Sequence, residues 1–242
     1  SAVIKAISLL EWKDSMENKE ILLTMRKISK TFPGVKALNN VDFTLRKGEI
    51  HALLGENGAG KSTLIKVLTG VESMDGGQVT LEGKPIHVKS SQHAQTLGIS
   101  TVYQEINLCG NLSVAENIFI GREPMAYGMI DWKMINKRAK ELLNILNVDI
   151  DVTKTLDSYP VAIQQMVAIA RALDISAKVL ILDEPTSSLD AAECKELFTV
   201  MRKLRNEGMG IIFVTHFLDQ VYEVSDRITV LRNGELVGEY EA

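Results

Sequence analysis

The chain has 242 residues, of which 45% are hydrophobic and 24% are charged, and its net charge is −4. This length and composition suit one globular domain with a sizeable core and room for an inserted subdomain. The acidic balance argues against a nucleic-acid-binding surface, and the longest apolar runs fall far short of the ~20 residues that span a bilayer. The two distant cysteines, Cys109 and Cys194, are typical of a reduced, cytoplasmic chain.

The start of the chain differs from the rest. Residues 1–10 are mostly apolar, and Met16-Glu-Asn-Lys-Glu resembles a natural start followed by a strand. We therefore predict that residues 1–20 form an N-terminal extension and that residues 21–242 form the folded unit. An amphipathic helix that docks on a partner is the alternative interpretation of residues 1–15.

From Ile21 onward, strand and helix signals alternate, which predicts an α/β core with a mainly parallel sheet. The predicted strands are Ile21–Lys27, Val41–Arg46, Glu49–Leu54, Gln78–Glu82, Ile99–Tyr103, Val179–Leu182, Gly210–Thr215 and Arg227–Arg232. Helices are predicted after Lys61, Asp131, Gln164, Ala191 and Phe217.

An aromatic side chain follows the first strand. Phe32, in Lys30-Thr-Phe-Pro-Gly, is a candidate platform on which adenine stacks. The competing interpretation is a buried core phenylalanine, because aromatic side chains mostly pack.

A phosphate-binding loop is the strongest motif. Residues 55–63 read Gly55, Glu56, Asn57, Gly58, Ala59, Gly60, Lys61, Ser62 and Thr63, which fits G-x-x-x-x-G-K-[ST]. Glycines let several backbone N–H groups point at one anion, Lys61 adds positive charge for the β- and γ-phosphates, and the Ser62 hydroxyl suits Mg²⁺. A buried strand precedes the loop and a helix follows it, which argues against a chance glycine-rich turn.

Polar side chains end two further strands. Gln104 follows Thr101-Val-Tyr, and its amide oxygen could reach both Mg²⁺ and water, although a polar strand cap is the alternative. Asp183 and Glu184 follow the buried strand Val179–Leu182, at the sheet edge where ligands bind in α/β proteins. We expect Asp183 to hold Mg²⁺ and Glu184 to polarise the attacking water, rather than to form a solvated acidic turn.

Two more polar residues lie further along the chain. Asp190 is predicted to cap the helix that begins at Ala191, to contact a partner's site, or to do both. His216 ends the strand Gly210–Thr215, where it could hydrogen-bond a γ-phosphate and sense its loss; a purely structural histidine is the alternative.

The stretch from about residue 107 to 165 lacks the alternation of strands and helices that marks the rest of the chain. Ser113–Ile120 and Asp131–Leu146 are predicted to be helical, with no strand between them, and the second has one apolar face. We interpret this stretch as a helical subdomain inserted in the sheet domain.

Together these motifs, in this order, resemble the nucleotide-binding domain of an ABC transporter over nearly all of residues 20–242. Phe32-Pro-Gly-Val-Lys-Ala-Leu, the loop at 55–63 and Ala115-Glu-Asn-Ile-Phe-Ile-Gly-Arg-Glu-Pro are similar to monosaccharide importers of the ribose/galactose type. The resemblance implies a P-loop NTPase (RecA-like) fold: a mixed, mainly parallel sheet with an antiparallel β edge and the inserted helices.

One motif departs from the family pattern. The family signature Leu-Ser-Gly-Gly-Gln aligns with Tyr159, Pro160, Val161, Ala162 and Ile163, and Gln164 continues as a family-like helix. Pro160 has neither the serine hydroxyl nor an N–H. In this family two domains enclose two ATP molecules, each site using one domain's Walker motifs and the other's signature. We therefore hypothesise the first half of a tandem, with Asp190, Pro160, Val161, Ala162 and Gln164 facing the second half.

The resemblance also implies the activity and the partners. ATP and Mg²⁺ would be the substrate and cofactor, and hydrolysis would drive import of a monosaccharide, such as galactofuranose or another pentose or hexose. The expected partners are a membrane permease, a second ABC ATPase domain and, indirectly, a periplasmic or extracellular sugar-binding protein, but no nucleic acid. The expected location is peripheral, on the cytoplasmic face of the inner membrane. A soluble ABC ATPase of nucleic-acid or translation processes and a regulatory nucleotide-binding module are the alternatives.

Overall fold

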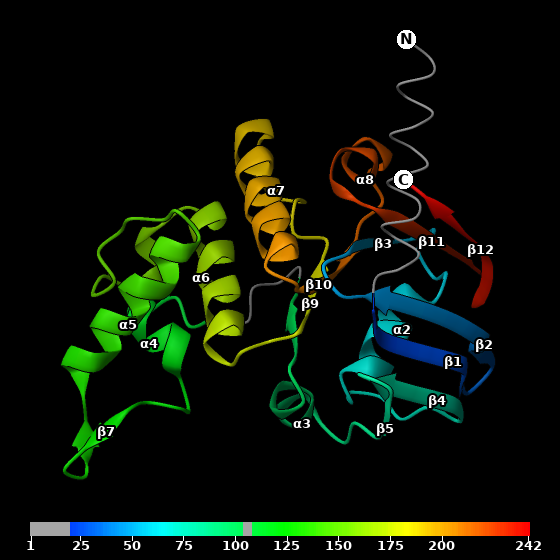
Figure 1. The fold of residues 1–242 in the computed structure, drawn as a ribbon, viewed down its shortest axis with the longest axis horizontal. Helices are drawn as coiled ribbons and strands as arrows, with labels where there is room; N and C mark the ends of the chain where they lie inside the picture. The colour runs from blue at the N-terminus through cyan, green and yellow to red at the C-terminus, as the bar shows by residue number, and fades with distance from the viewer. Residues whose placement is uncertain (1–19, 104–107) are drawn as a thin grey trace.

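A six-stranded sheet lies at the centre of the molecule. The computed structural model describes residues 20–103 and 108–242 (Figure 1). The strand order is β12-β11-β3-β10-β9-β6, and all strands run parallel except β12, which pairs antiparallel with β11. The strands are β3 (Ile50–Leu54), β6 (Ile99–Val102), β9 (Val179–Asp183), β10 (Gly210–Val214), β11 (Arg227–Arg232) and β12 (Glu235–Glu241).

A second, antiparallel sheet has the order β2-β1-β4-β5. Its strands are β1 (Ile21–Phe32), β2 (Val35–Arg46), β4 (Gly76–Leu81) and β5 (Lys84–Ile86). The predicted mixed architecture is therefore confirmed, although most of the antiparallel strands form a sheet of their own. β1 continues to Phe32, past the predicted end at Lys27, where a positive φ of 52° and a register shift mark a bulge.

Helices cover the parallel sheet. They are α2 (Lys61–Leu68), α3 (Ser91–Thr96), α4 (Val114–Phe119), α5 (Trp132–Ile145), α6 (Val161–Asp174), α7 (Ala191–Asn206) and α8 (Leu218–Val224), with a 3-10 turn at Leu156–Ser158. We call α4, α5 and α6 the helical layer; they stand to the left in Figure 1. Their mutual packing agrees with the expected run of helices.

The prediction that no strand separates the first two of these helices is wrong. A hairpin of β7 (Met125–Ala126) and β8 (Met129–Ile130) joins α4 to α5. Strands of two residues give no periodic signal in a sequence, which explains the miss.

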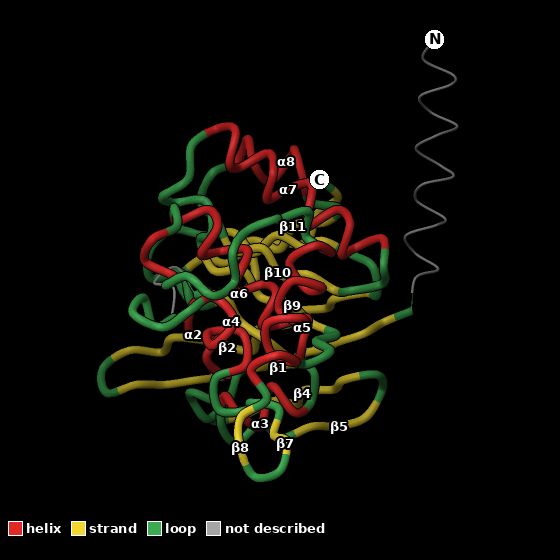
Figure 2. The backbone as a smooth tube through the Cα atoms, turned by 90° about the vertical axis from the view of Figure 1, so that its left-hand side faces the viewer, coloured by secondary structure: helices red, strands yellow, loops and turns green. Residues whose placement is uncertain are grey.

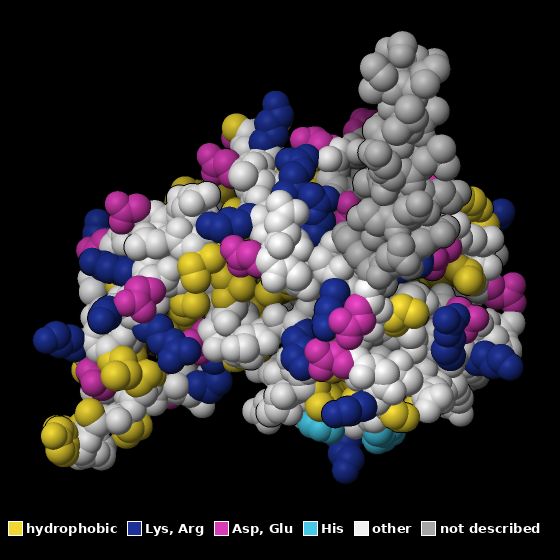
Figure 3. Space-filling view, viewed as in Figure 1, with side chains coloured by type: hydrophobic (Ala, Val, Ile, Leu, Met, Phe, Trp, Pro, Cys, Tyr) yellow, Lys and Arg dark blue, Asp and Glu magenta, His cyan; other side chains and the backbone are white. Residues whose placement is uncertain are grey.

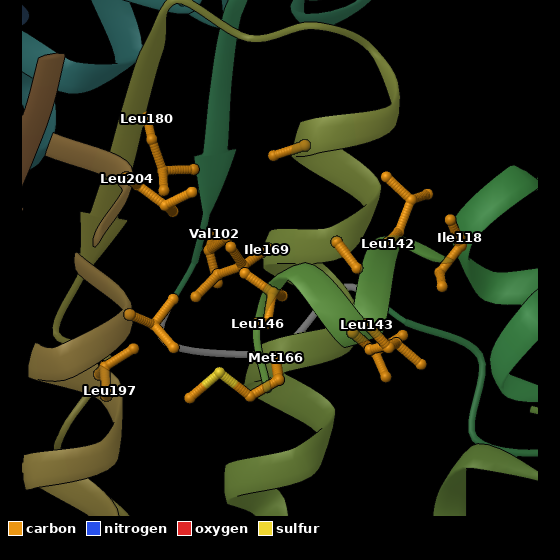
Figure 4. Packing of buried hydrophobic residues seen from close by; sticks show 14 of the residues in the cluster. Val102, Ile118, Leu142, Leu143, Leu146, Met166, Ile169, Leu180, Leu197 and Leu204 are labelled. Atoms are coloured by element: carbon orange, nitrogen blue, oxygen red, sulfur yellow. The ribbon is translucent and has the colours of Figure 1, made fainter. Parts of the chain in front are cut away.

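Both faces of the parallel sheet are buried, because successive side chains of a strand point to opposite faces. Leu180 and Leu182 pack with α6 and α7, as does Phe213 of β10. Their neighbours Val179 and Ile181 pack instead with α2 and the antiparallel sheet. Figure 4 shows part of the first cluster, in which Val102 of β6 lies beside Ile169 of α6 and Leu180 of β9 lies beside Leu204 of α7.

A buried polar network lies at the start of β3. His51 has its Nδ1 2.9 Å from Oε1 of Glu49 and its Nε2 2.7 Å from Oγ1 of Thr229, and Arg227 donates to the same carboxylate at 3.0 Å. Burial lowers the pKa of His51, which therefore stays neutral. Burial works to raise the pKa of Glu49, but the hydrogen bond from His51, the charge of Arg227 and the hydrogen bond from the N–H of Arg46 more than offset it and lower that pKa.

None of the helices in the described ranges is long and apolar enough to span a bilayer. The predicted extension at residues 1–20 lies outside the described residues except for Glu20, and the division at residue 21 stays a prediction.

Candidate functional site

The loop that joins β3 to α2 has a backbone that only glycine can adopt at one critical point. Gly60 has φ = +103°, and a Cβ there would lie 2.8 Å from the carbonyl oxygen of Ala37. Gly58 also has a positive φ, of 82°. These conformations curl residues 55–60 into a tight loop directly before α2, as the motif predicted.

The N-terminus of α2 is open to an anion. Its N-cap, Gly60, provides no side-chain hydrogen bond, and no acidic residue lies in the first turn. The first N–H groups of a helix have no partner within the helix, and the helix dipole is positive at this end. The loop and the helix start therefore form a phosphate-binding geometry.

Lys61 lies over this loop. Its Nζ donates to the carbonyl oxygen of Gly55 at 2.6 Å and to that of Glu56 at 3.2 Å. These bonds hold the ammonium group at the loop, although the side chain belongs to the first residue of α2.

One cleft of about 630 Å³ brings most of the predicted residues together. It is lined by Phe32, Val35, Lys36, Ala37, Asn57, Gly58, Ala59, Gly60, Lys61, Ser62, Thr63, Asp183, Glu184 and Asn233. We call it the P-loop cleft. Lys61 and Asp183 thus share one site, although β3 and β9 are not adjacent strands: β10 lies between them.

Two acids enter the cleft from the end of β9. Burial raises the pKa of Asp183, the charge of Glu184 adds to this, and Lys61 and Lys66 partly oppose it. Glu184 has a positive φ of 48°, and its N–H donates to the carbonyl oxygen of Val214 at 2.9 Å. A non-glycine residue in this conformation stores strain, which is typical of functional sites.

His216 approaches the same acid from the end of β10. Its Nδ1 lies 3.3 Å from Oε1 of Glu184, and about half of its side chain is exposed. The two strand ends therefore place a titratable ring beside the carboxylate, and the ring itself packs on Phe217.

Phe32 is not a buried core residue. It lines the P-loop cleft, and the ammonium of Lys30 lies 5.2 Å from the centroid of its ring. Lys30 is itself buried and is held by Ser73 at 3.3 Å, Glu72 at 3.7 Å and Asp75 at 3.8 Å. This cation occupies one face of the ring, so a base can stack only on the other.

Replacing Lys30 with methionine is expected to weaken ATP binding about two- to fivefold, because the ring loses its cation–π contact and its anchor to the loop after α2. Binding of inorganic tripolyphosphate, which has no base, should not change. Calorimetric titration of both ligands checks this, with exposed Lys84→Met as the matched control. A parallel loss for both ligands would contradict the prediction.

Other predicted residues lie outside this cleft. Asp190 caps α7, accepting hydrogen bonds from the N–H groups of Ala192 and Glu193 at 2.8 Å each. Its predicted capping role is therefore observed, and the partner contact stays a prediction. Gln104 lies outside the described residues.

The predicted inter-domain residues gather at the start of α6. Pro160 is the N-cap, Val161 and Ala162 begin the first turn, and Nε2 of Gln164 donates to the carbonyl oxygen of Tyr159 at 2.9 Å. None of them lines the P-loop cleft of their own chain. Their predicted role toward a second domain stays a prediction.

Sequence reasoning missed four lining residues: Val35, Lys36, Ala37 and Asn233. Asn233 and Gly234 form the turn between β11 and β12, and the N–H of Gly234 donates to the carbonyl oxygen of Ala59 at 3.0 Å. The Asn-Gly pair signals a hairpin, but no local signal tells that the hairpin turn packs on the phosphate loop.

Comparisons with known proteins agree on one family. The family model described as ABC transporter matches residues 38–187. The chain is 62% identical, over 92% of its length, to the galactofuranose transporter ATP-binding protein of Escherichia coli (strain K12). It is 54% identical, over 93% of its length, to the fructose import ATP-binding protein of Bifidobacterium longum (strain NCC 2705). The chain spans only 44% of each of these relatives.

Among solved structures, the fold is similar to the ADP conformation of an ATP-binding cassette of an ABC transporter. The TM-score is 0.82 at 27% sequence identity, and the match covers 92% of this chain and 91% of that one.

Proposed function

Because the chain belongs to the ABC transporter family, whose cassettes bind nucleotide, we propose that it binds and hydrolyses ATP to energise import of a monosaccharide. The observation that carries the proposal is the P-loop cleft, where a phosphate-binding loop faces two strand-end acids. The sugar class is supported by relatives whose names specify galactofuranose transport and fructose import. The individual sugar is chosen by other components of such a system.

In this proposal the protein promotes hydrolysis by positioning ATP and the attacking water and by stabilising the negative charge of the phosphates. Lys61 and the N–H groups at the start of α2 bind the phosphates. Glu184 accepts a hydrogen bond from the attacking water, orients it toward the γ-phosphate and takes its proton as general base. His216, beside Glu184, donates a hydrogen bond to the γ-phosphate, and Phe32 stacks on the base.

The donor set of the cleft fits Mg²⁺, a hard cation that takes oxygen ligands. Ser62 and Asp183 line the same cleft. Burial first, and the charge of Glu184 second, raise the pKa of Asp183, and a cation bound beside the carboxylate would stabilise its ionised form. Gln104 is proposed as a third ligand from the sequence alone. When bound, the ion would neutralise charge on the phosphates.

A second cassette is proposed to complete the site. The relatives are more than twice as long as the matched region, which is consistent with a tandem of two cassettes. The start of α6, with Pro160 where the family has serine, would face the second cassette's nucleotide and stabilise it poorly. The P-loop cleft would instead receive the second cassette's own signature.

A membrane permease is proposed to dock in a groove of about 460 Å³, which we call the α3–α6 groove. Its walls include Lys66 of α2, Gln95 of α3, Arg171 of α6 and Tyr103. Burial lowers the pKa of Arg171, and none of the groove's described lining residues is acidic. The groove thus suits a permease segment that carries a carboxylate.

The function is tested by reconstitution. The chain alone is expected to bind Mg-ATP and to hydrolyse it slowly, and adding the natural second cassette should raise turnover strongly. With permease and binding protein in vesicles, one monosaccharide should stimulate phosphate release. An unchanged rate with the second cassette would contradict the asymmetric pairing, and absence of ATP binding would contradict the function itself.

A further inference from the structure

The hairpin of β7 and β8 is the most exposed apolar feature in the described part of the chain. It protrudes from the helical layer, and hydrophobic side chains gather at its tip in the space-filling view (Figures 1 and 3). Met125 is 60% exposed, Met129 71%, and Tyr127 fully exposed. The proposed ATPase function uses none of these side chains.

The turn that forms the tip has a defined geometry. Tyr127 and Gly128 both have positive φ, of 51° and 81°, as a type I′ turn requires. The N–H of Asp131 donates to the carbonyl oxygen of Pro124 at 2.8 Å and closes the base of the hairpin. The exposed apolar side chains therefore stand on an ordered support.

Both faces of this hairpin are apolar. Met125 pairs with Ile130 and Ala126 pairs with Met129. Paired residues share a face and successive residues alternate, so Met125 and Ile130 lie on one face, Met129 lies on the other, and Tyr127 lies at the turn. A protein surface would cover one such face, whereas an acyl-chain boundary surrounds an inserted tip on all sides.

The residues behind the tip have the chemistry of a bilayer interface. Trp132 is half exposed, and Trp and Tyr are the aromatic residues that concentrate at headgroup level. Between Asp131 and Glu141 the chain carries Lys133, Lys137, Arg138 and Lys140. Lys137 lies 3.9 Å from Glu141 and Arg138 lies 2.8 Å from Asp174, whereas Lys133 and Lys140 form no ion pair within the described residues. This local positive charge complements an anionic lipid surface.

The position of the hairpin agrees with such a contact. In Figures 1 and 2 the hairpin and α3 lie at the same end of the molecule, and α3 forms one wall of the α3–α6 groove. A permease seated in that groove would bring this end toward the membrane. This geometric step alone rests on the proposed function.

We propose that the β7–β8 hairpin is a membrane-contact element that inserts its apolar tip into a bilayer containing anionic lipids, with the lysines of α5 at the headgroups. Insertion of a few side chains gives weak, reversible binding that needs the electrostatic contribution. The hairpin would anchor the helical layer and leave the rest of the cassette free to move.

Tryptophan fluorescence tests the proposal, because the chain has two tryptophans, Trp12 and Trp132. In the Trp12→Phe protein, emission reports Trp132 alone. Phosphatidylcholine vesicles containing one part in three of phosphatidylglycerol, with brominated acyl chains, should quench it, and vesicles of phosphatidylcholine alone should quench it much less. The double variant Tyr127→Ser, Met129→Ser should weaken vesicle binding more than about tenfold.

Two further variants refine the test. Lys133→Gln should weaken binding to the anionic vesicles about fivefold. The matched control is Val237→Ser, Tyr240→Ser on β12, where both side chains are 54% exposed; it should bind vesicles like the parent. ATP titration of every variant confirms folding and separates failure of this proposal from failure of the ATPase function.

The proposal is overturned if Trp132 emission is insensitive to both vesicles, or if the hairpin variant binds them as well as its control does. Loss of permease association in the hairpin variant without any vesicle binding would assign the surface to a protein partner instead.

Discussion

Replacing Glu184 with glutamine is expected to lower ATP turnover about 10²- to 10⁴-fold while leaving ATP affinity close to the parent value. Glutamine keeps the shape of the side chain and can still hydrogen-bond His216, which lies 3.3 Å from Oε1 of Glu184. It cannot accept a proton from the attacking water. The effect should therefore appear in the chemical step and not in binding.

The measurement is phosphate release by the chain paired with its second cassette, together with titration of Mg-ATP. Glu196→Gln, an exposed acid on α7, is the matched control and should hydrolyse ATP at the parent rate. Turnover of the Glu184 variant near the parent rate would remove this residue from the catalytic role.

Replacing Lys61 with alanine should weaken ATP binding about 10- to 100-fold, because a charge-assisted hydrogen bond to the phosphates is lost. The side chain also bridges the carbonyl oxygens of Gly55 and Glu56, so some loss of thermal stability should accompany the loss of affinity. The loss of ATP affinity and the loss of thermal stability both follow from removing one ammonium group.

Isothermal titration and a thermal melt separate the two effects. Lys66→Ala, on the exposed face of the same helix, removes the same charge outside the P-loop cleft and should keep near-parent affinity. Equal losses in the two variants would mean that overall charge, and not the loop contact, governs binding.

The sequence predicted best the parts of the fold that carry long apolar runs. The core strands β9 and β10 lie within one residue of their expected bounds, since a buried parallel strand reads as a nearly continuous apolar run. β5 has only three residues, α3 is a polar helix of six, and β12 reads Glu-Leu-Val-Gly-Glu-Tyr-Glu at a sheet edge. Elements this short or this polar depend on tertiary contacts that no local pattern reports.

The residues of the candidate site also differ in whether the sequence alone could predict them. Lys61, Asp183 and Glu184 were predictable because each follows a strand or opens a helix with a recognisable chemical pattern. Asn233 reaches the cleft only because the turn after β11 packs on Ala59, and Lys30 supports Phe32 only because the loop after α2 folds back over it. Such contacts join residues that are distant in the chain, so they needed the three-dimensional structure.

The polar network around His51 has a consequence for the opposite end of its strand. All five residues of β3 are buried, so hydrophobicity alone would tolerate sliding β3 along its neighbours. A slip of one residue would turn His51 to the other face and break its hydrogen bonds with Glu49 and Thr229. It would also shift the following loop by about 3.3 Å along the sheet relative to Asp183. The network therefore fixes the register of β3, and with it the position of the phosphate-binding loop relative to Asp183.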